Sequence, residues 1–462
     1  MFKVILAITF CYLAAAYSVA AQWGTVNKPF SVNSLWNSRP VNPILSGVTV
    51  PASTYFPTVQ GGAYSTGVYV ASATDQPMTV YGPSATVGIK NVDIGGYVTS
   101  MVIPRWPANA VPATGSDGHC EIYDPIAKVI HSFWQLKNVT GVWRATLYGW
   151  AALDGTGWGD PAHYYQGARA VGIVSSAGII RKHEVDDGDV MYRHALALSL
   201  TYNALANGSN TYVFPATSAD GDASTTNYGA IPEGSLLMLP SSFNASKLTT
   251  QKLRKVAETL KTYGARVVDR NVGTPYAIYV EIGANYSLHP PGGWSNTAAS
   301  ELQTIREALR PLVSASSWLN GNGQPVTFSQ NQNLLSMRGP WTLQSGDALG
   351  VFDTYQQAVV FPSKSARVTQ TNSNGTGFAK LNWAKPIAGQ SYNLTAITTG
   401  GGQLRLSFNL DCSDSTKVIN SGALNNGQSF VFTWPASNCW HTLYAISGLN
   451  QASSVSASLI KV

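Results

Sequence analysis

The stretch VIHSFWQLKNVTGVWRATLYGW, residues 129–150, decides the fold class of this chain. Two short runs rich in β-branched and aromatic residues, 129–134 and 143–150, flank a segment that contains Asn and Gly. Similar runs at 68–71 and 98–103 are bounded by clusters of Gly, Pro, Asn and Asp. Short strands separated by turn signals are typical of a sandwich or barrel rather than of alternating β-α units. We therefore predict a mainly β protein whose larger part is a jelly-roll-like β-sandwich.

Two segments in the middle of the chain predict helices. In residues 249–264, four apolar side chains are spaced three or four positions apart, Thr249 can cap the start, and Gly264 can cap the end. The segment 302–312 repeats this spacing with leucine and isoleucine. We expect both helices to be peripheral, to pack on the outside of the sheet and to have a structural role.

A second, smaller β-sandwich is predicted from Val326 to the end of the chain. Apolar residues alternate strictly along 404–410 and 430–434, which is the period of half-buried strands. Cys412 and Cys439 both lie in this part, and we expect a disulfide between them. Small sandwiches need most of their aromatic residues for the core, so core positions are predicted for the tryptophans at 383, 434 and 440.

The first 21 residues have the layout of a secretory signal peptide. Lys3 supplies the positive charge, an apolar run follows over 4–16, and the small residues Val19-Ala20-Ala21 form the cleavage site. No other stretch is long and apolar enough to cross a membrane. The sequence thus predicts a secreted protein divided into a signal peptide (1–21), a catalytic β-sandwich (22–325) and a C-terminal carbohydrate-binding-like sandwich (326–462).

Composition narrows the class of partner. Charged residues make up 11% of the chain, whereas 43 Gly, 13 Trp and 22 Tyr are present. The net charge is +6, but no run of Lys and Arg concentrates it, which argues against nucleic acid. We expect an extracellular polysaccharide as the partner, no membrane after signal cleavage, and a monomer. In a eukaryotic source, the Asn-x-Ser/Thr sequons would mark glycosylated surface loops; they begin at Asn138, Asn207, Asn244, Asn285, Asn374 and Asn393.

The first polar segment, 117–124, follows an Asp-Gly turn and enters a strand. Strand alternation places His119 and Glu121 on one face, where they could line a cleft and transfer protons. Asp117 and Asp124 add carboxylates. Cys120, on the opposite face, is predicted to be a buried apolar residue.

The second polar segment, 183–194, contains three aspartates around a Gly. A calcium loop is one interpretation, although the spacing does not match the twelve-residue calcium loop. A structural calcium ion is therefore the only cofactor that we consider. His194 precedes an apolar run, so it is expected to be partly buried, either as a core histidine or as a site residue. Glu184, Tyr192 and Arg193 are its neighbours in the candidate site.

The third segment is Asp220-Gly221-Asp222, for which a tight turn is the simpler interpretation. A glycoside hydrolase nevertheless needs two carboxyl groups across a cleft, and Asp220 is a candidate for one of them. A zinc site built on His119, Glu121 and His194 lacks the short-spaced ligand pairs that such sites usually have. No metal ligand set is therefore predicted.

Further short motifs follow the Asp-Gly-His of residues 117–119 along the chain: His-Ala-Leu at 194–196, Pro-Ala at 215–216, Asp-Gly at 220–221, Ile-Pro-Glu-Gly at 231–234 and Tyr-Gly at 263–264 with Asp269. The order of these motifs resembles a set of secreted microbial β-rich proteins. The similarity covers roughly residues 33–312, but no established reaction attaches to that family. The resemblance implies an extracellular carbohydrate-active protein, and matching positions imply a role for Asp117, His119, Glu184 and His194. The chain departs from the family pattern in Gly172-Ile173-Val174, where a Leu-Pro would follow the glycine, and in 168–170, where an acidic residue would be expected.

The leading hypothesis is a polysaccharide-degrading glycoside hydrolase that uses paired carboxylates. A polysaccharide lyase with a His or Tyr base, acting on a uronate polymer, is the alternative enzyme. A non-catalytic wall-binding protein is the alternative from another class. The candidate substrate-binding residues are Trp134, Tyr192 and Arg193, and the candidate catalytic residues are Asp117, His119, Glu121, Glu184, His194 and Asp220.

Overall fold

The computed structural model describes residues 22–91, 96–159, 163, 165–208, 211–328, 341–346, 350–353, 358–372 and 388–462. The predicted signal peptide lies outside these residues. The described part contains six β-sheets and three α-helices, so the mainly β class is confirmed. No helix among the described residues combines the length and the apolar character needed to span a bilayer.

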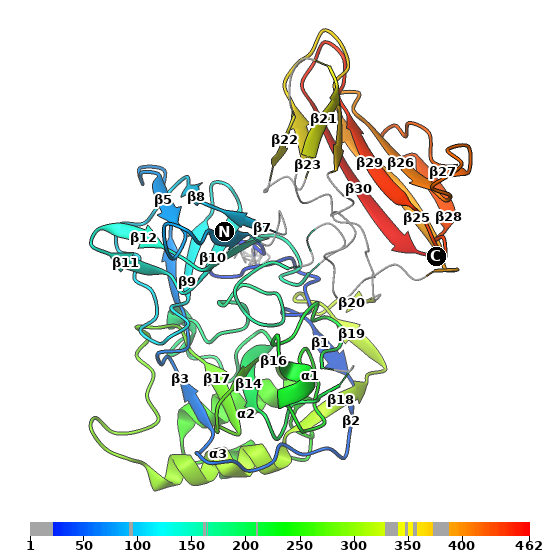
Figure 1. Ribbon diagram of the computed structural model, residues 1–462. Helices are drawn as coiled ribbons and strands as arrows, with labels where there is room; N and C mark the ends of the chain where they lie inside the picture. Colours follow the sequence, from blue (N-terminus) through cyan, green and yellow to red (C-terminus); the bar gives the residue numbers. More distant parts are fainter. Residues whose placement is uncertain are drawn as a thin grey trace, which may run out of the picture.

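A seven-stranded mixed sheet forms one layer of the larger part of the molecule (Figure 1). β14 pairs in parallel with β16, and β17 pairs in parallel with β3. Parallel neighbours need a long crossover connection, and α2 (Gln251–Thr262) lies in the crossover from β14 to β16. The strand order is β2 (Ile44–Leu45), β18 (Arg310–Ser314), β15 (Leu236–Met238), β16 (Ala265–Asn271), β14 (Leu196–Thr201), β17 (Tyr276–Tyr279) and β3 (Thr58–Gln60).

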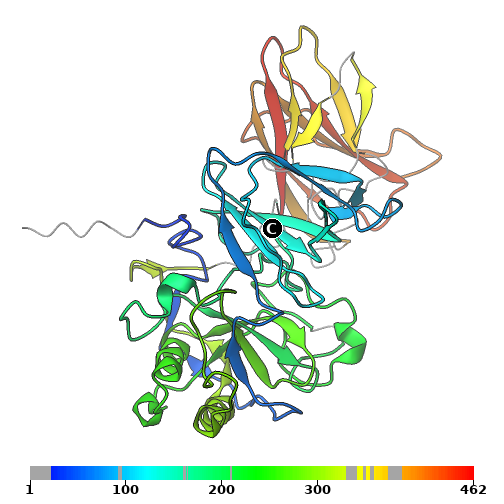
Figure 2. The ribbon, with the colours of Figure 1, turned by 90° about the vertical axis from the view of Figure 1, so that its left-hand side faces the viewer.

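The helices α2 and α3 (Asn296–Ala308) lie beside one another below this sheet (Figure 2). Leu253 and Leu260 of α2 pack in one core cluster with Leu198 of β14, so the predicted amphipathic helix is confirmed. The second predicted helix was wrong at its end, because α3 stops at Ala308 and β18 follows. Pro311 explains this difference, since a proline disfavours helical geometry in the residue before it.

A six-stranded sheet packs on the other face of the seven-stranded sheet. Tyr123 and Ile130 of the six-stranded sheet share a core cluster with Met238 and Val268 of the seven-stranded one. Two sheets packed face to face are consistent with a sandwich-like class. The parallel pairs β4·β9 and β13·β6 are features that the strand patterns did not reveal. The strand order is β4 (Gly67–Val70), β9 (Cys120–Asp124), β10 (Val129–Trp134), β13 (Leu147–Ala152), β6 (Ile89–Asn91) and β7 (Gly96–Val98).

Smaller elements complete the larger part. A four-stranded sheet covers the outer face of the six-stranded sheet, and the buried Cys120 lies in the core between them, as predicted. A three-stranded sheet, a short helix α1 and two single-turn 3₁₀ helices account for the rest. The four-stranded sheet consists of β11 (Lys137–Val139), β12 (Val142–Arg144), β5 (Met78–Tyr81) and β8 (Ser100–Ile103). The three-stranded sheet consists of β1 (Arg39–Val41), β19 (Ser317–Leu319) and β20 (Pro325–Val326). The short helices are α1 (Ala223–Thr226) and the 3₁₀ helices Lys182–Glu184 and Ala245–Lys247.

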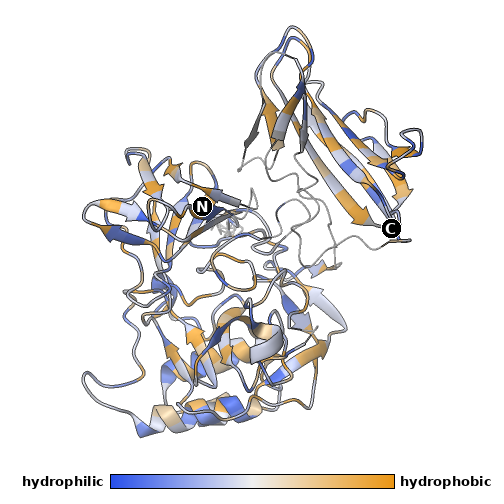
Figure 3. Ribbon diagram, in the orientation of Figure 1, coloured by the Kyte–Doolittle hydropathy of each residue, from blue (hydrophilic) through white to orange (hydrophobic). Residues whose placement is uncertain are grey.

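Two five-stranded sheets form the C-terminal part. In the described residues, no sheet combines a strand from before Val326 with one from after it. Hydrophobic and polar residues alternate along their strands (Figure 3), and the inward side chains form one core cluster. The strand order of one sheet is β21 (Trp341–Ser345), β24 (Thr369–Asn372), β29 (Trp440–Ile446), β26 (Gln403–Asn409) and β27 (Val418–Asn420). The strand order of the other sheet is β22 (Val351–Asp353), β23 (Ala358–Phe361), β30 (Ser453–Lys461), β25 (Ser391–Thr399) and β28 (Ser429–Thr433).

The disulfide between Cys412 and Cys439 is confirmed. Trp434 packs against the C-terminal core cluster, as expected. Trp440 is 54% exposed, so the prediction that it is a core residue was wrong. It is the first residue of β29, and strand alternation puts it on the face opposite to the buried Leu443 and Ala445. Trp383 lies outside the described residues.

Candidate functional site

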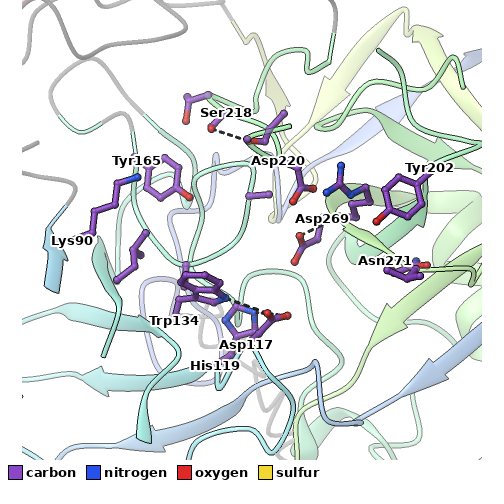
Figure 4. A pocket seen from close by; sticks show the side chains of 18 of the residues that line it. Lys90, Asp117, His119, Trp134, Tyr165, Tyr202, Ser218, Asp220, Asp269 and Asn271 are labelled. Atoms are coloured by element: carbon purple, nitrogen blue, oxygen red, sulfur yellow. Dashed lines mark hydrogen bonds and ion pairs between the residues drawn. The ribbon is translucent and has the colours of Figure 1, made fainter. Parts of the chain in front are cut away.

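A cavity of about 670 Å³ collects polar side chains from both large sheets (Figure 4). The six-stranded sheet and the turn before it supply one wall, and β16 supplies the facing wall. Two loops close the remaining sides. The chemically useful lining residues are Lys90, Asn91, Asp117, His119, Trp134, Tyr165, Tyr202, Ser218, Asp220, Asp269, Arg270 and Asn271.

Asp117 and His119 reach the cavity from the turn that leads into β9. The indole N–H of Trp134 donates to Oδ1 of Asp117 over 3.2 Å, and Asp117 is 33% exposed. Nε2 of His119 lies 4.0 Å from Oδ2 of Asp117. Nδ1 of His119 is hydrogen-bonded to Oγ of Ser175 at 3.0 Å. The sequence thus predicted three residues that the structure does bring together.

Burial lowers the pKa of His119 well below its ordinary value, and the positive charge of Arg169 acts in the same direction. A histidine with such a pKa is neutral at physiological pH. His119 therefore supplies no permanent positive charge to the cavity, and its lowered pKa makes it a weaker proton acceptor than an ordinary histidine.

Asp269, on β16, faces the same cavity from the seven-stranded sheet. Its side chain is 17% exposed, and Nη1 of Arg169 donates to its Oδ2 over 2.8 Å. Burial raises the pKa of Asp269 to about 6, and the negative charges of Asp220 and Asp117 add to this effect against the opposing charge of Arg169. Asp269 consequently holds a proton over a higher pH range than an ordinary aspartate.

Asp220 lies on the loop before α1, next to a second buried carboxyl group. The backbone N–H of Asp220 donates to Oε1 of Glu233 over 3.4 Å. Burial raises the pKa of both side chains, and their mutual interaction raises that of Glu233 further. A hydrogen bond between the two side chains adds to this, lowering the pKa of Asp220 and raising that of Glu233, so the proton of the pair resides on Glu233.

Glu121 is not where the strand alternation predicted it. Its side chain is fully buried between the sheets, outside the cavity lining, where it accepts hydrogen bonds from the hydroxyl of Ser132, the N–H of Ser175 and the hydroxyl of Ser176. Burial raises the pKa of Glu121 to about 8. The expectation that Glu121 lies in the cleft beside His119 is therefore corrected, because the cavity opens at the start of β9 and the rest of the strand is covered.

The residues of segment 183–194 do not line this cavity. Nε2 of His194 lies 3.2 Å from the carboxylate of Glu184, and Nδ1 of His194 is hydrogen-bonded to the carbonyl of Ala195. Both residues line a separate, smaller cavity together with Arg193. The expectation that they join Asp117 and His119 is corrected, since the sheets place the two segments in different pockets.

Tyr192 is a core residue. Its ring is 1% exposed and packs in the cluster that joins the seven-stranded sheet to the helices, and Nζ of Lys255 lies 4.6 Å from its ring centre. The substrate-binding role predicted for Tyr192 is thus corrected, because the ring is inaccessible. Trp134, by contrast, lines the cavity as predicted.

The acidic turn is held by ion pairs. Lys255 contacts Asp187, and Nε of Arg193 lies 3.4 Å from Oδ2 of Asp189. Within the residues described, no group of three or more His, Cys, Asp and Glu is arranged to hold a metal ion. The structural calcium ion stays a prediction.

The sequence did not predict the roles of Asp269, Arg169 and Glu233. Asp269 interrupts the apolar run of β16, and an acidic residue inside such a strand is a usable signal. Arg169 occupies the segment where an acidic residue was expected, and its guanidinium instead pairs with Asp269. Only the folded chain shows that pairing.

Comparisons with known proteins give no family match. No family model and no curated protein matches it. Among solved structures, the Glycosylation Associate Protein complex of Streptococcus agalactiae aligns at 14% identity over 27% of this chain and 45% of that one, with a TM-score of 0.16. Accessory secretory protein 1, 2 and 3 of Streptococcus pneumoniae aligns at 13% over 29% and 99%, with a TM-score of 0.17. The enzymatically active domain of bacteriophage CBA120 tailspike protein 4 aligns at 14% over 26% and 19%, with a TM-score of 0.18. These scores carry no argument about fold or function.

Proposed function

We propose that this chain is a secreted glycoside hydrolase that cleaves an extracellular polysaccharide in the cavity around Asp117 and Asp269. The observation that carries the proposal is the meeting of these two carboxyl groups, from different sheets, at one cavity with an aromatic wall. Glycosidases place one protonated and one ionised carboxyl group on either side of the scissile bond. Trp134 and Tyr165 offer ring surfaces on which a sugar can stack.

The environments of the two carboxyl groups suggest their roles. Asp269 is the proposed general acid, because a pKa of about 6 lets it carry a proton at mildly acidic pH. Asp117 is the proposed base or nucleophile, held in place by the indole N–H of Trp134. Asp220 lies in the same cavity beside the buried Glu233, and its negative charge helps to keep the proton on Asp269.

The test is a panel of polysaccharides incubated with the mature chain and assayed for new reducing ends and for unsaturated-uronate absorbance. We expect reducing ends without absorbance, and we expect Asp269→Asn and Asp117→Asn each to lower the rate by about a thousandfold. Asp154→Asn is the matched control, because Asp154 forms only a surface ion pair with Lys128. Polymer retention without any product would overturn the proposal in favour of a wall-binding protein.

A lyase is the second candidate, and a specific observation favours it. The neutral His119 shares the cavity with two cationic side chains, Lys90 and Arg270. In a lyase, a neutral base removes the proton beside a uronate carboxylate while a cation neutralises that carboxylate. Unsaturated products that disappear in His119→Gln but persist in Asp269→Asn would establish this reaction instead.

A further inference from the structure

A second cavity, of about 680 Å³, adjoins the first. The two cavities share the backbone segment 269–272 of β16 and the loop after it, and they share Asp117. The two proposed catalytic carboxyl groups therefore line both cavities. Each cavity has the volume that holds a small-molecule ligand, such as a short oligosaccharide.

The lining of the second cavity differs from that of the first. Beyond the shared residues it contains no charged side chain: its polar groups are tyrosines, hydroxyls and amides, and small or apolar residues such as Ala63 and Ile278 complete it. Tyr55 and Tyr64 are 61% and 55% exposed, so their rings are available to a ligand. Exposed rings among hydroxyl and amide groups suit uncharged sugar residues, which offer both apolar ring faces and hydroxyls.

The buried side chain of Arg169 connects the wall of the second cavity to the proposed catalytic residue Asp269. Arg169 is 1% exposed, and its two terminal nitrogens donate to different partners, Oδ2 of Asp269 at 2.8 Å and the carbonyl of Tyr64 at 3.1 Å. Its guanidinium also lies 4.0 Å from the ring centre of Tyr279, which lines the second cavity. A planar guanidinium with several fixed contacts sets distances that a flexible side chain would not.

We infer that the two cavities form one groove, with Asp117 and Asp269 on its floor and sugar-binding positions on both sides. A polymer can then lie across the carboxyl groups with sugar residues bound in each cavity. Such a groove cuts within the chain, whereas a pocket closed behind the carboxyl groups would remove sugars from an end. This inference rests on the proposed function and adds internal cleavage to it.

The first test uses the polymer that yields the most product and compares two readouts over the first few percent of cleavage. Internal cleavage lowers the mean chain length, followed by size-exclusion chromatography, well before small products accumulate. Release of mono- or disaccharides from the outset, with the polymer length unchanged, would overturn the inference while leaving the proposed hydrolase intact. Absence of cleavage and binding with every polymer would overturn both proposals.

The second test measures binding rather than turnover. Oligosaccharides of two to eight sugars are titrated into Asp117→Asn by calorimetry, and again into the same variant with Tyr55→Ala and Tyr64→Ala. We expect affinity to increase with length beyond the capacity of one cavity, and the tyrosine changes to weaken the longest ligands about tenfold. Tyr97→Ala is the control, because Tyr97 is 66% exposed and lines neither cavity. Affinity that stops increasing at two or three sugars and ignores Tyr55 and Tyr64 would overturn the inference.

Discussion

The two polar segments that the sequence singles out, 117–124 and 183–194, end in opposite environments. In the second, the charges compensate one another: Glu184 and His194 lie 3.2 Å apart, and Lys255 contacts Asp187. In the first, Asp117 faces a cavity that also holds Asp220 and Asp269, two carboxyl groups whose pKa is raised.

This difference shows how a buried polar cluster can be assigned. A cluster in which each charge has a partner of opposite sign gains stability from its contacts. Carboxyl groups that raise one another's pKa, as Asp220 and Asp117 do for Asp269 despite its ion pair with Arg169, lose stability by this repulsion. Such groups persist where the rest of the fold compensates, which is common at catalytic sites. We therefore expect substitutions in the first region to act mainly on turnover and substitutions in the second to act on folding.

The largest expected effect is on turnover in the first region. Asp269→Asn removes the proposed proton donor and should lower kcat about a thousandfold. It also removes the counter-charge of the buried Arg169, so the melting temperature should fall, and rates are compared at a temperature where both proteins are folded. In wild-type protein, the rate should fall as the pH rises above about 6, where Asp269 loses its proton. Initial rates from pH 4 to 8 give the profile. A variant that keeps the wild-type rate would show that the cavity acts through other groups.

The second prediction concerns stability in the second region. Glu184→Gln should cost about 3 kcal/mol of unfolding free energy, because it leaves a buried His194 without its counter-charge. Burial alone would raise the pKa of Glu184, but His194 and the N–H of Arg181 lower it to about 2. Burial alone would lower the pKa of His194, but Glu184 raises it.

The directions of these two pKa shifts define the pH range in which the Glu184–His194 ion pair stabilises the folded chain. The Glu184 contribution is present above pH 4.5 and is lost as the pH falls through about 2. The His194 contribution is present below pH 6.5 and is lost as the pH rises through its raised pKa. Urea unfolding should therefore show the largest difference between wild type and Glu184→Gln from pH 4.5 to 6.5. A difference that is equal at pH 5 and pH 9 would argue against the ion pair.

The two regions also show which strands and site residues could be predicted from the sequence. Strand alternation and turn residues located β9 and β10, since these signals are local. The run 143–150, predicted as one strand, is instead divided between β12 and β13 of two different sheets. The segment 117–119 and Trp134 were found because an Asp-Gly turn and a strand end are visible in the residues themselves. Asp269 was not nominated, because its role depends on Arg169 and Asp117, which lie far from it in sequence and meet it only through sheet packing.

Helix patterning had a similar limit. The apolar spacing of 302–312 continues through Leu309 and Leu312, but Pro311 ends the helical geometry and the residues become β18. Glu121 was misplaced for a related reason. Alternation assigns a side chain to a face of the strand, but it does not say whether that face opens to a cavity or is covered by the next sheet.

A smaller effect on turnover is expected from Trp134→Phe. The change keeps an aromatic ring in the cavity wall and removes the N–H that donates to Asp117 over 3.2 Å. Loss of one hydrogen bond to a charged group should lower kcat/KM about tenfold. Trp143→Phe is the control, because Trp143 packs on Trp106 away from the cavity and should change kcat/KM by less than about twofold. Equal losses in the two variants would indicate a packing effect.

The smallest effect is predicted for Glu121→Gln. Because burial raises the pKa of Glu121 to about 8, the carboxyl group is largely neutral below that pH, and a glutamine amide can keep the hydrogen bonds from Ser132 and Ser175. The unfolding free energy should change by less than about 1 kcal/mol at pH 5.

The pH dependence is the decisive readout for Glu121. The stability associated with its neutral form is complete below pH 4.5, the ordinary value, and is lost as the pH rises through about 8. Glutamine does not ionise, so Glu121→Gln should flatten the decline in stability over that interval and become the more stable protein at pH 8. Parallel stability curves for the two proteins would mean that the folded chain holds Glu121 ionised. The serines that donate hydrogen bonds to Glu121 would then stabilise its negative charge. The charge on Glu121 would be compensated within the first region, as the charges of Glu184 and His194 are compensated within the second.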